Sequence, residues 1–219
     1  MLNIFFSANG DGSYGFTPGG YAALAVIFFL IIVGVAMLGS HQKTISTKQI
    51  AFSAVAMALA FVTSNLKVLH MPMGGSVTLF SMFFITLIGY LYGPVIGIMV
   101  GVAYGLLQMV IDPYIISLPQ MLVDYPLAFG ALGISGFFCN KRKGLITGYA
   151  AGVLGRYFFA VLSGVIFFGM YAPENMGPFV YSLAYNGAYL GLEAAITIAL
   201  LLVPAVYKGI AQVKEMAQD

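Results

Sequence analysis

The sequence is poor in charged residues, and this shortage excludes most soluble folds. Asp, Glu, Lys and Arg make up 7% of the 219 residues, while hydrophobic residues make up 61%. Ordinary soluble domains have roughly 25% and 45–50%. The mean hydropathy of +0.97 therefore predicts one multi-pass membrane domain. The net charge of +2 is too small and too scattered to indicate nucleic-acid binding.

Cysteine pairs and recognisable processing signals are also missing. Cys139 is the single cysteine and tryptophan is absent, so the sequence predicts no disulfide framework. The first twenty residues contain no Lys or Arg, and the apolar run after them is too long for the core of a signal peptide. We therefore expect no cleaved targeting segment.

The sequence lacks the motifs of the common catalytic and energy-converting sites. It has no GxxxxGK[ST] motif for nucleotide hydrolysis, and His41 and His70 lie in predicted loops without a metal-binding pattern. No Ser–His–acid set can form within the membrane. Two matching halves, which build alternating-access carriers, are not found either. We expect a protein that is not an enzyme, holds no metal or covalent cofactor, and binds a ligand that other proteins help to move.

Apolar runs predict seven membrane-spanning helices. The first covers Tyr21–Leu38 and is separable from the remaining six. Those six are expected at about 47–66, 77–92, 94–111, 117–138, 145–170 and 179–207. We therefore divide the chain into an N-terminal part (1–46), a six-helix membrane domain (47–207) and a C-terminal tail (208–219).

Basic residues orient these helices, because Lys and Arg concentrate in cytoplasmic loops. If the seven helices alternate in direction, most of the basic residues fall on one side, with Lys67 as the exception. They are Lys43, Lys48, Lys141, Arg142, Lys143, Lys208 and Lys214. The pattern predicts an N-terminus outside the cell and a C-terminus in the cytoplasm.

An acidic residue, Asp124, lies inside one of the expected spans beside Tyr125. It is seven residues into a helix that enters from outside, or roughly 10 Å deep. A charged group at membrane depth costs roughly 2.5–3.5 kcal/mol on insertion scales and usually has a function. Asp124 could bridge two helices or contact a ligand, and its position beside Tyr125 favours the ligand.

Three further polar residues are expected in the membrane. With Asp124, the deeper Arg156 and Glu193 sum to one negative charge if all are ionised, which favours a cationic ligand. Arg156 and Glu193 could instead pair with each other, the commoner fate of such groups. Asn186, at a depth similar to Asp124, could recognise a ring nitrogen with an adjacent amine, or form an interhelical hydrogen bond worth about 0.6 kcal/mol.

Aromatic residues are dense at the level of Asp124. Their faces bind flat heterocycles and cations, although an interfacial aromatic belt is the alternative explanation. The residues concerned are Tyr114, Tyr125, Tyr157, Phe168, Tyr181 and Tyr185. On the helix at 47–66, Ala51, Ala54 and Ala58 share a face that allows another helix to approach closely, either within the protein or from a partner.

Together these motifs resemble the thiamine-binding S-component of energy-coupling factor (ECF) transporters, the ThiT or YuaJ family. The resemblance covers about 47–207 in order. It rests on Met71-Pro-Met-Gly-Gly-Ser76, Leu122-Val-Asp-Tyr-Pro-Leu-Ala-Phe129, Gly155-Arg-Tyr157, Tyr171-Ala-Pro-Glu174, Tyr181-Ser182 and Tyr185-Asn-Gly187.

The resemblance implies an all-α integral membrane protein of the bacterial cell membrane, with a six-helix S-component bundle plus one extra N-terminal helix. It implies an outward-facing thiamine pocket, and docking onto a transmembrane coupling protein and two cytoplasmic ATPases, which alone use ATP. The implied ligand contacts are Asp124, Tyr125, Tyr181 and Asn186, with Tyr114, Phe168 and Tyr157 as further candidates. Ala54 and Ala58, with Ala51, are the implied docking face.

Two positions depart from the family pattern. Ala160 stands where members commonly have a histidine, and Phe168 stands where some have a tryptophan. These changes remove a hydrogen-bond donor and some stacking area, so a thiamine precursor or another small heterocycle stays open as the ligand. A stand-alone proton-coupled carrier that uses Asp124 and Glu193, or a purely structural subunit, also stays open.

Overall fold

The computed structural model describes residues 4, 6–8, 14–23, 26, 45–71 and 75–218. Most of the predicted span at 21–38 lies outside the described residues. In the described part, five helical segments are long and apolar enough to cross a membrane: Thr47–Ser64, Pro94–Ile111, Leu118–Phe138, Gly144–Phe167 and Pro178–Leu201. With the shorter apolar helix Ser81–Tyr92, they confirm the predicted all-helical membrane fold.

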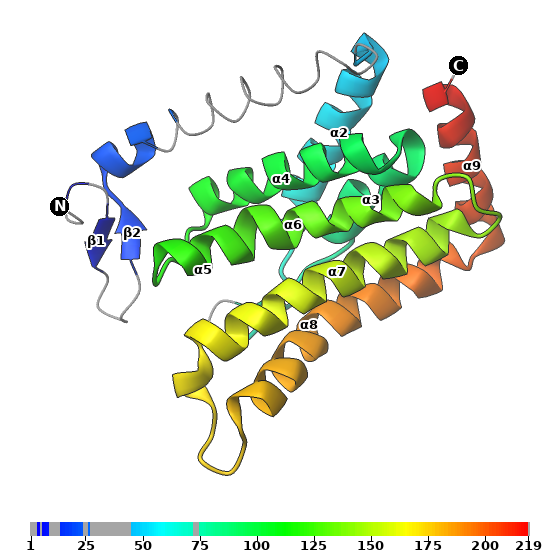
Figure 1. The fold of residues 1–219 in the computed structure, drawn as a ribbon. Helices are drawn as coiled ribbons and strands as arrows, with labels where there is room; N and C mark the ends of the chain where they lie inside the picture. Colours follow the sequence, from blue (N-terminus) through cyan, green and yellow to red (C-terminus); the bar gives the residue numbers. More distant parts are fainter. Residues whose placement is uncertain are drawn as a thin grey trace.

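The helices are α2 (Thr47–Ser64), α3 (Ser81–Tyr92), α4 (Pro94–Ile111), α7 (Gly144–Phe167), α8 (Pro178–Leu201) and α9 (Pro204–Gln218), with a composite segment between α4 and α7. Figure 1 shows α4, the composite segment, α7 and α8 side by side, with α9 lying across one end. The described part also contains the 3-10 helix η6 (Gly169–Tyr171) and two short antiparallel pairs: β1 (Phe6–Ala8) with β2 (Tyr14–Phe16), and β3 (Leu69–His70) with β4 (Ser76–Val77).

The composite segment is one span built from four short elements of three helix types. It consists of α5 (Leu118–Leu122), the π-helical η4 (Val123–Leu127), α6 (Ala128–Gly130) and the 3-10 helix η5 (Ala131–Phe138). Pro126 lies inside η4 and has no N–H for a regular helix. Single π-helical turns are often found at functional sites, and η4 contains Asp124.

Helix α4 packs against this composite segment through glycines. A Cβ atom added at Gly101 would lie 2.4 Å from the carbonyl oxygen of Phe129, and one at Gly105 would lie 2.4 Å from that of Tyr125. The two backbones therefore approach as closely as small residues permit. This contact fixes the position of η4 relative to the rest of the bundle.

Helix α3 begins four residues later than the sequence predicts, because a distant carboxylate binds its N-terminal end. Glu193 of α8 accepts hydrogen bonds from Thr78 Oγ1 (2.6 Å), Ser81 Oγ (3.2 Å) and the Met82 N–H (3.2 Å). A negative charge is favourable at a helix N-terminus. Glu193 therefore does not form the alternative ion pair with Arg156. Phe80, the residue immediately before α3, has a left-handed backbone with a φ of 61°.

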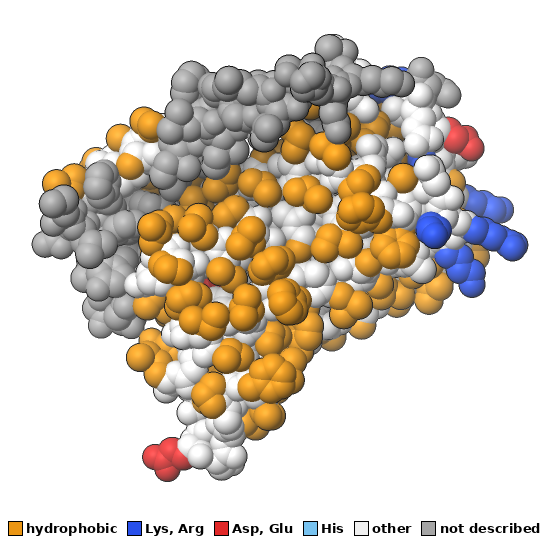
Figure 2. Space-filling model, in the orientation of Figure 1, with side chains coloured by type: hydrophobic (Ala, Val, Ile, Leu, Met, Phe, Trp, Pro, Cys, Tyr) orange, Lys and Arg blue, Asp and Glu red, His pale blue; other side chains and the backbone are white. Residues whose placement is uncertain are grey.

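The helix predicted to run to Tyr207 ends at Leu201, and α9 begins at Pro204. The predicted domain boundary at 207 therefore falls inside α9. Side chains hold α9 to the end of the bundle: Lys48 Nζ donates to the Met216 carbonyl (3.2 Å), and Lys214 donates to the Cys139 carbonyl. Figure 2 shows Lys and Arg side chains gathered at this end of the molecule.

Candidate functional site

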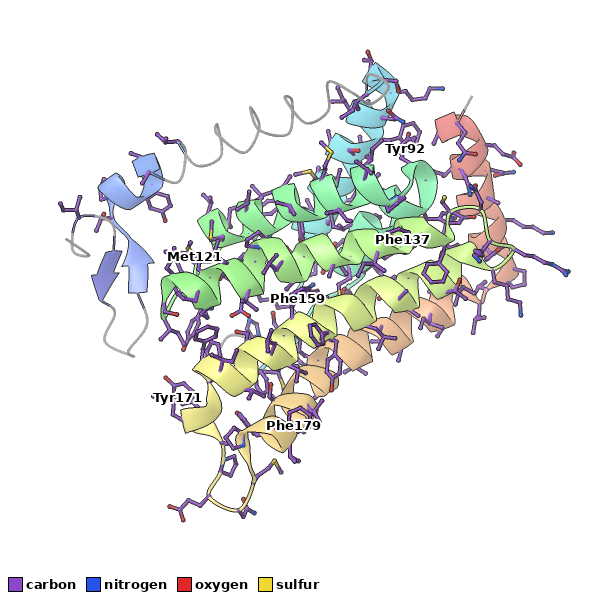
Figure 3. The ribbon with its side chains drawn as sticks, viewed as in Figure 1. Tyr92, Met121, Phe137, Phe159, Tyr171 and Phe179 are labelled. Carbon is purple, nitrogen blue, oxygen red and sulfur yellow. The ribbon has the colours of Figure 1, made fainter. Side chains whose placement is uncertain are left out.

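A cavity of about 240 Å³ opens between the composite segment, α7, α8 and the β3–β4 hairpin, with the ends of α2 and α4 also contributing. It is slightly smaller than the roughly 300–1,000 Å³ typical of small-molecule sites, which suits a compact ligand. Figure 3 shows Met121 and Tyr171 toward one end of the bundle and Tyr92 and Phe137 toward the other. The cavity lies toward the Tyr171 end, because Phe168, which contacts Tyr171, lines it.

Asp124 lines the cavity and is held in place by Gln120, one helical turn earlier. Gln120 Nε2 donates to Asp124 Oδ2 at 2.6 Å and to the Tyr114 carbonyl at 3.1 Å, while its Oε1 accepts from the Ile116 N–H at 3.0 Å. Gln120 is 1% exposed. One buried amide therefore connects the carboxylate to the loop between α4 and α5. Ser163 of α7 lies beside Asp124, yet its buried hydroxyl forms no hydrogen bond of normal geometry with any described residue.

Tyr125 lines the cavity with its ring and binds the same loop with its hydroxyl. The hydroxyl donates to the Asp112 carbonyl (3.1 Å) and accepts from the Tyr114 N–H (2.8 Å). The side chain is buried, with 9% exposed. Tyr125 therefore offers a ligand an aromatic surface, since its polar atom already has two partners.

Helix α8 contributes a row of tyrosines on one face. Tyr181, Tyr185 and Tyr189 are spaced by four residues and line the cavity. Their ring centroids are 5.8 Å apart for the first pair and 5.7 Å apart for the second. The Tyr185 hydroxyl accepts from the Gly75 N–H at 3.0 Å, so this row also holds the hairpin over the cavity.

Asn186 lies on the cavity wall, and its amide is largely occupied. Its Nδ2 donates to the carbonyl (2.9 Å) and hydroxyl (3.1 Å) of Ser182 and to the Ala160 carbonyl (3.3 Å). Its Oδ1 accepts from the Tyr189 hydroxyl at 2.8 Å. The interhelical hydrogen bond considered from the sequence is thus present. Among the described residues Oδ1 has this one donor, which leaves its second acceptor position for a ligand.

The outer rim combines an aromatic pair with an ion pair. Tyr114 and Phe168 stack with their ring centroids 6.0 Å apart and their planes inclined by 25°. Lys67 Nζ lies 2.8 Å from Asp112 Oδ2 and joins the loop after α2 to the end of α4. All four residues line the cavity, so three segments meet at this end of it: the loop after α2, the loop after α4 and the end of α7.

Helix α7 presents a narrow stripe to the cavity. Arg156, Ala160, Ser163 and Gly164 line it, as expected for residues on one helical face. The Arg156 guanidinium lies 4.0 Å from the centroid of the Phe129 ring, within range of a cation–π contact. The stripe therefore begins with the charged Arg156, and its remaining side chains, toward the C-terminal end of α7, are small.

Tyr157 is the predicted contact that does not line the cavity. Its hydroxyl donates to the Leu183 carbonyl at 3.0 Å, so the side chain packs between α7 and α8. Its neighbour Arg156 occupies the cavity face instead, because adjacent helical residues point in directions roughly 100° apart. The other predicted ligand contacts all line the cavity: Asp124, Tyr125, Asn186, Tyr181, Tyr114 and Phe168.

The predicted docking residues lie on the surface of α2. Ala51, Ala54 and Ala58 are exposed, whereas Ala56 and Ala60 face the core. Neighbouring Val55 and Val62 are 60% and 58% exposed. Ile50 and Leu59 are exposed as well, so the apolar face that α2 turns away from the bundle combines the three alanines with larger aliphatic side chains.

Sequence reasoning missed Gln120 and Tyr189. The spacing of Tyr181, Tyr185 and Tyr189 would have identified Tyr189, because residues four apart share a helical face. Gln120 likewise precedes Asp124 by four residues. Its bonds to the loop depend on the turn at 112–117, which hydropathy does not reveal.

Comparison with known proteins gives one consistent result. The family model described as thiamine transporter protein (Thia_YuaJ) matches residues 50–211. The thiamine transporter ThiT of Bacillus subtilis (strain 168) is 35% identical over 185 residues, covering 77% of this chain and 95% of that protein. ThiT of Lacticaseibacillus paracasei is 28% identical over 118 residues, covering 46% of this chain and 59% of that protein. The solved structure of ThiT from Listeria monocytogenes has a TM-score of 0.55 and 26% identity, covering 73% of this chain and 94% of that one.

Proposed function

The chain belongs to the thiamine transporter (ThiT/YuaJ) family, and we propose that it binds thiamine in the cavity between the composite segment, α7 and α8. The single observation that supports this most directly is the carboxylate of Asp124, held by Gln120 inside a cavity walled by aromatic rings. Thiamine has one permanently cationic ring and one flat neutral ring. A fixed negative charge among aromatic faces suits both.

We propose the following contacts. Asp124 offsets the charge of the thiazolium ring or accepts from the exocyclic amine. Tyr125, Tyr181, Tyr114 and Phe168 provide ring surfaces, and Asn186 accepts a hydrogen bond through the open position on Oδ1. We leave Tyr157 out, because its hydroxyl donates to the Leu183 carbonyl between α7 and α8 and the side chain does not line the cavity.

Transport itself requires a separate energising module in this proposal. The alanine face of α2 (Ala51, Ala54 and Ala58) docks onto a transmembrane coupling protein, and two cytoplasmic ATPases supply the energy. The cavity then opens outward, and the basic end of the molecule around α9 lies in the cytoplasm. The exposure of this small-residue face and the gathering of basic residues at one end support the arrangement.

A related heterocycle is the second candidate ligand. Ala160 and Phe168 line the cavity where the family pattern has larger or more polar groups, so the pocket could suit a thiamine precursor. We do not propose proton-coupled transport, because three hydrogen bonds tie Glu193 to the start of α3 and leave it poorly placed as a relay.

The test is binding by the purified full chain in detergent or nanodiscs. We expect calorimetry to give tighter binding for thiamine than for its separate pyrimidine half or for other vitamins, and thiamine to raise the melting temperature. Mass spectrometry should identify the small molecule retained during purification. Tighter binding of the pyrimidine half would establish the precursor as the ligand, and binding of neither would contradict the proposal.

A further inference from the structure

Four basic side chains at the α9 end of the bundle have no polar partner in the described part of the chain. Lys141, Arg142 and Lys143 form the loop before α7, and Lys208 lies on α9. All four are exposed, and none of their side chains forms a hydrogen bond or an ion pair with a described residue. Glu215 is the one acidic residue described on α9 or in the loop, so this surface is strongly positive.

Two other lysines at the same end already have partners. Lys214 donates to the Cys139 carbonyl, and its ammonium lies 4.1 Å from the centroid of the Tyr90 ring. Lys48 Nζ donates to the Met216 carbonyl at 3.2 Å. Carbonyl groups at helix ends lack partners within the helix, so these two lysines hold α9 against the bundle. The four exposed cations have no such structural task.

The fold brings the four cations onto one surface. The Tyr207 hydroxyl donates to the Arg142 carbonyl at 3.4 Å and joins the start of α9 to the loop, and Lys208 directly follows Tyr207 in the chain. Figure 2 shows the basic side chains projecting from this end of the molecule. Like charges that gather in this way repel one another, and a bound anion would offset the repulsion. We call these four residues the basic surface.

Exposed apolar side chains precede the basic residues in both segments. Phe137, ahead of the loop, is 63% exposed, and Leu202, in the turn before α9, is 65% exposed. Figure 3 shows Phe137 toward this end of the bundle. In a protein that spans a membrane, such side chains contact the acyl chains of lipids. The basic residues that follow them therefore lie at the level of the lipid headgroups.

The direction of α9 presents Lys208 to the same level. The chain breaks after Leu201 and α9 begins at Pro204, so α9 lies across the end of the bundle instead of continuing α8 (Figure 1). Val206 and Ile210 pack against the core, while Lys208 is exposed. A helix with one apolar and one basic side is typical of the membrane interface. Its basic side therefore faces away from the bundle.

We propose that the basic surface binds the phosphate of an anionic phospholipid, such as phosphatidylglycerol, whose acyl chains lie against Phe137 and Leu202. Phosphate oxygens accept strong hydrogen bonds from lysine, and from arginine in pairs. Clusters of basic residues next to a membrane span are typical of anionic lipid binding. An acidic protein fits less well, because one lipid supplies both the anion and the apolar chains that this surface borders. The inference goes beyond the proposed function, since neither thiamine nor the energising module takes part.

The test compares two lipids on the full chain. Native mass spectrometry of protein released from nanodiscs of phosphatidylglycerol and phosphatidylcholine in equal amounts counts the retained lipids, and melts in detergent with added lipid give relative affinities. We expect wild type to prefer phosphatidylglycerol, and this lipid to raise the melting temperature. Each basic residue near an anionic surface contributes about fivefold. The triple variant Lys141→Gln, Arg142→Gln, Lys143→Gln should therefore bind phosphatidylglycerol about 100-fold more weakly.

Two single variants separate a binding site from overall charge. Lys208→Gln should lower the preference for phosphatidylglycerol by about fivefold and leave the melting temperature in phosphatidylcholine unchanged. Lys48→Gln makes the same change in charge at the same end, but it removes a lysine that is bonded to Met216. This control should melt at a lower temperature and keep the lipid preference. Equal losses of preference in the two variants would show that only net charge matters and would overturn the site.

The remaining outcomes also decide the inference. Equal retention of both lipids by wild type, or wild-type preference in the triple variant, would overturn it. Inorganic phosphate that raised the melting temperature as much as phosphatidylglycerol would assign the surface to a free anion. Loss of co-purification with the coupling protein, together with unchanged lipid preference, would assign it to a protein partner. Each of these results leaves thiamine binding intact, and failure of wild type to bind thiamine would overturn the proposed function alone.

Discussion

Replacing Asp124 with Asn should weaken thiamine binding without destabilising the empty protein. The amide has the shape of the carboxylate and can still accept from Gln120 Nε2, which lies 2.6 Å from Asp124 Oδ2. What it loses is the charge-assisted contact with the ligand, worth about 1.5–3 kcal/mol, or roughly 10- to 150-fold in Kd. A charge at membrane depth also costs roughly 2.5–3.5 kcal/mol on insertion scales. The melting temperature of the empty variant should therefore stay the same or rise.

Calorimetry with thiamine and a thermal melt without ligand measure the two effects separately. Glu174→Gln is the matched control, because Glu174 is exposed in the loop between α7 and α8 and the substitution makes the same change in net charge. We expect the control to bind thiamine like wild type. Unchanged affinity in Asp124→Asn would remove Asp124 from the site. An equal loss in Glu174→Gln would show that only the overall charge matters.

Three other predictions concern the support of the site, the packing of α4 and the alanine face. Gln120→Leu should lower the free energy of unfolding by about 1–3 kcal/mol, because the Ile116 N–H and the Tyr114 carbonyl lose buried partners. The variant should also bind thiamine more weakly. A wild-type melting temperature together with wild-type affinity would contradict this prediction. Gly101→Ala should destabilise the protein by about 1–3 kcal/mol, because the new Cβ would lie 2.4 Å from the Phe129 carbonyl. Gly191→Ala, where a Cβ would meet nothing within 4 Å, should melt at or slightly above the wild-type temperature, and equal melting of the two variants would refute the packing account. Ala58→Trp should abolish vitamin uptake and co-purification with the coupling protein, because the large side chain would block the exposed alanine face of α2, while thiamine affinity stays unchanged. Normal uptake would show that partners dock elsewhere.

The membrane spans could be predicted from sequence because hydropathy depends on composition along the chain. Their exact ends could not, where a distant residue decides them. Helix α3 starts at Ser81 because Glu193 binds Thr78, Ser81 and Met82. Nothing local in the sequence reveals a bond across that distance.

The site shows the same division. Depth along a helix was enough to bring Asp124 and Asn186 to one level, with Tyr181 nearer the surface, and all three line the cavity. Direction around the helix was not considered for Tyr157, which points to Leu183. Counting the face of α7 from Arg156 would have selected Ala160, Ser163 and Gly164 instead, since those residues share one side of the helix.

The widened turn at Val123–Leu127 makes the number of residues in this span as important as their identity. Its i→i+5 bonding takes up about one residue more than an ordinary turn, so deleting one residue at this turn would let an ordinary helix form and leave the residues beyond it facing nearly the same way. A deletion in the regular part of the span would instead rotate everything beyond it by roughly 100°, which would move Phe129 away from Arg156 and break the glycine contacts with α4. Family members without the widened turn should therefore be one residue shorter at this point.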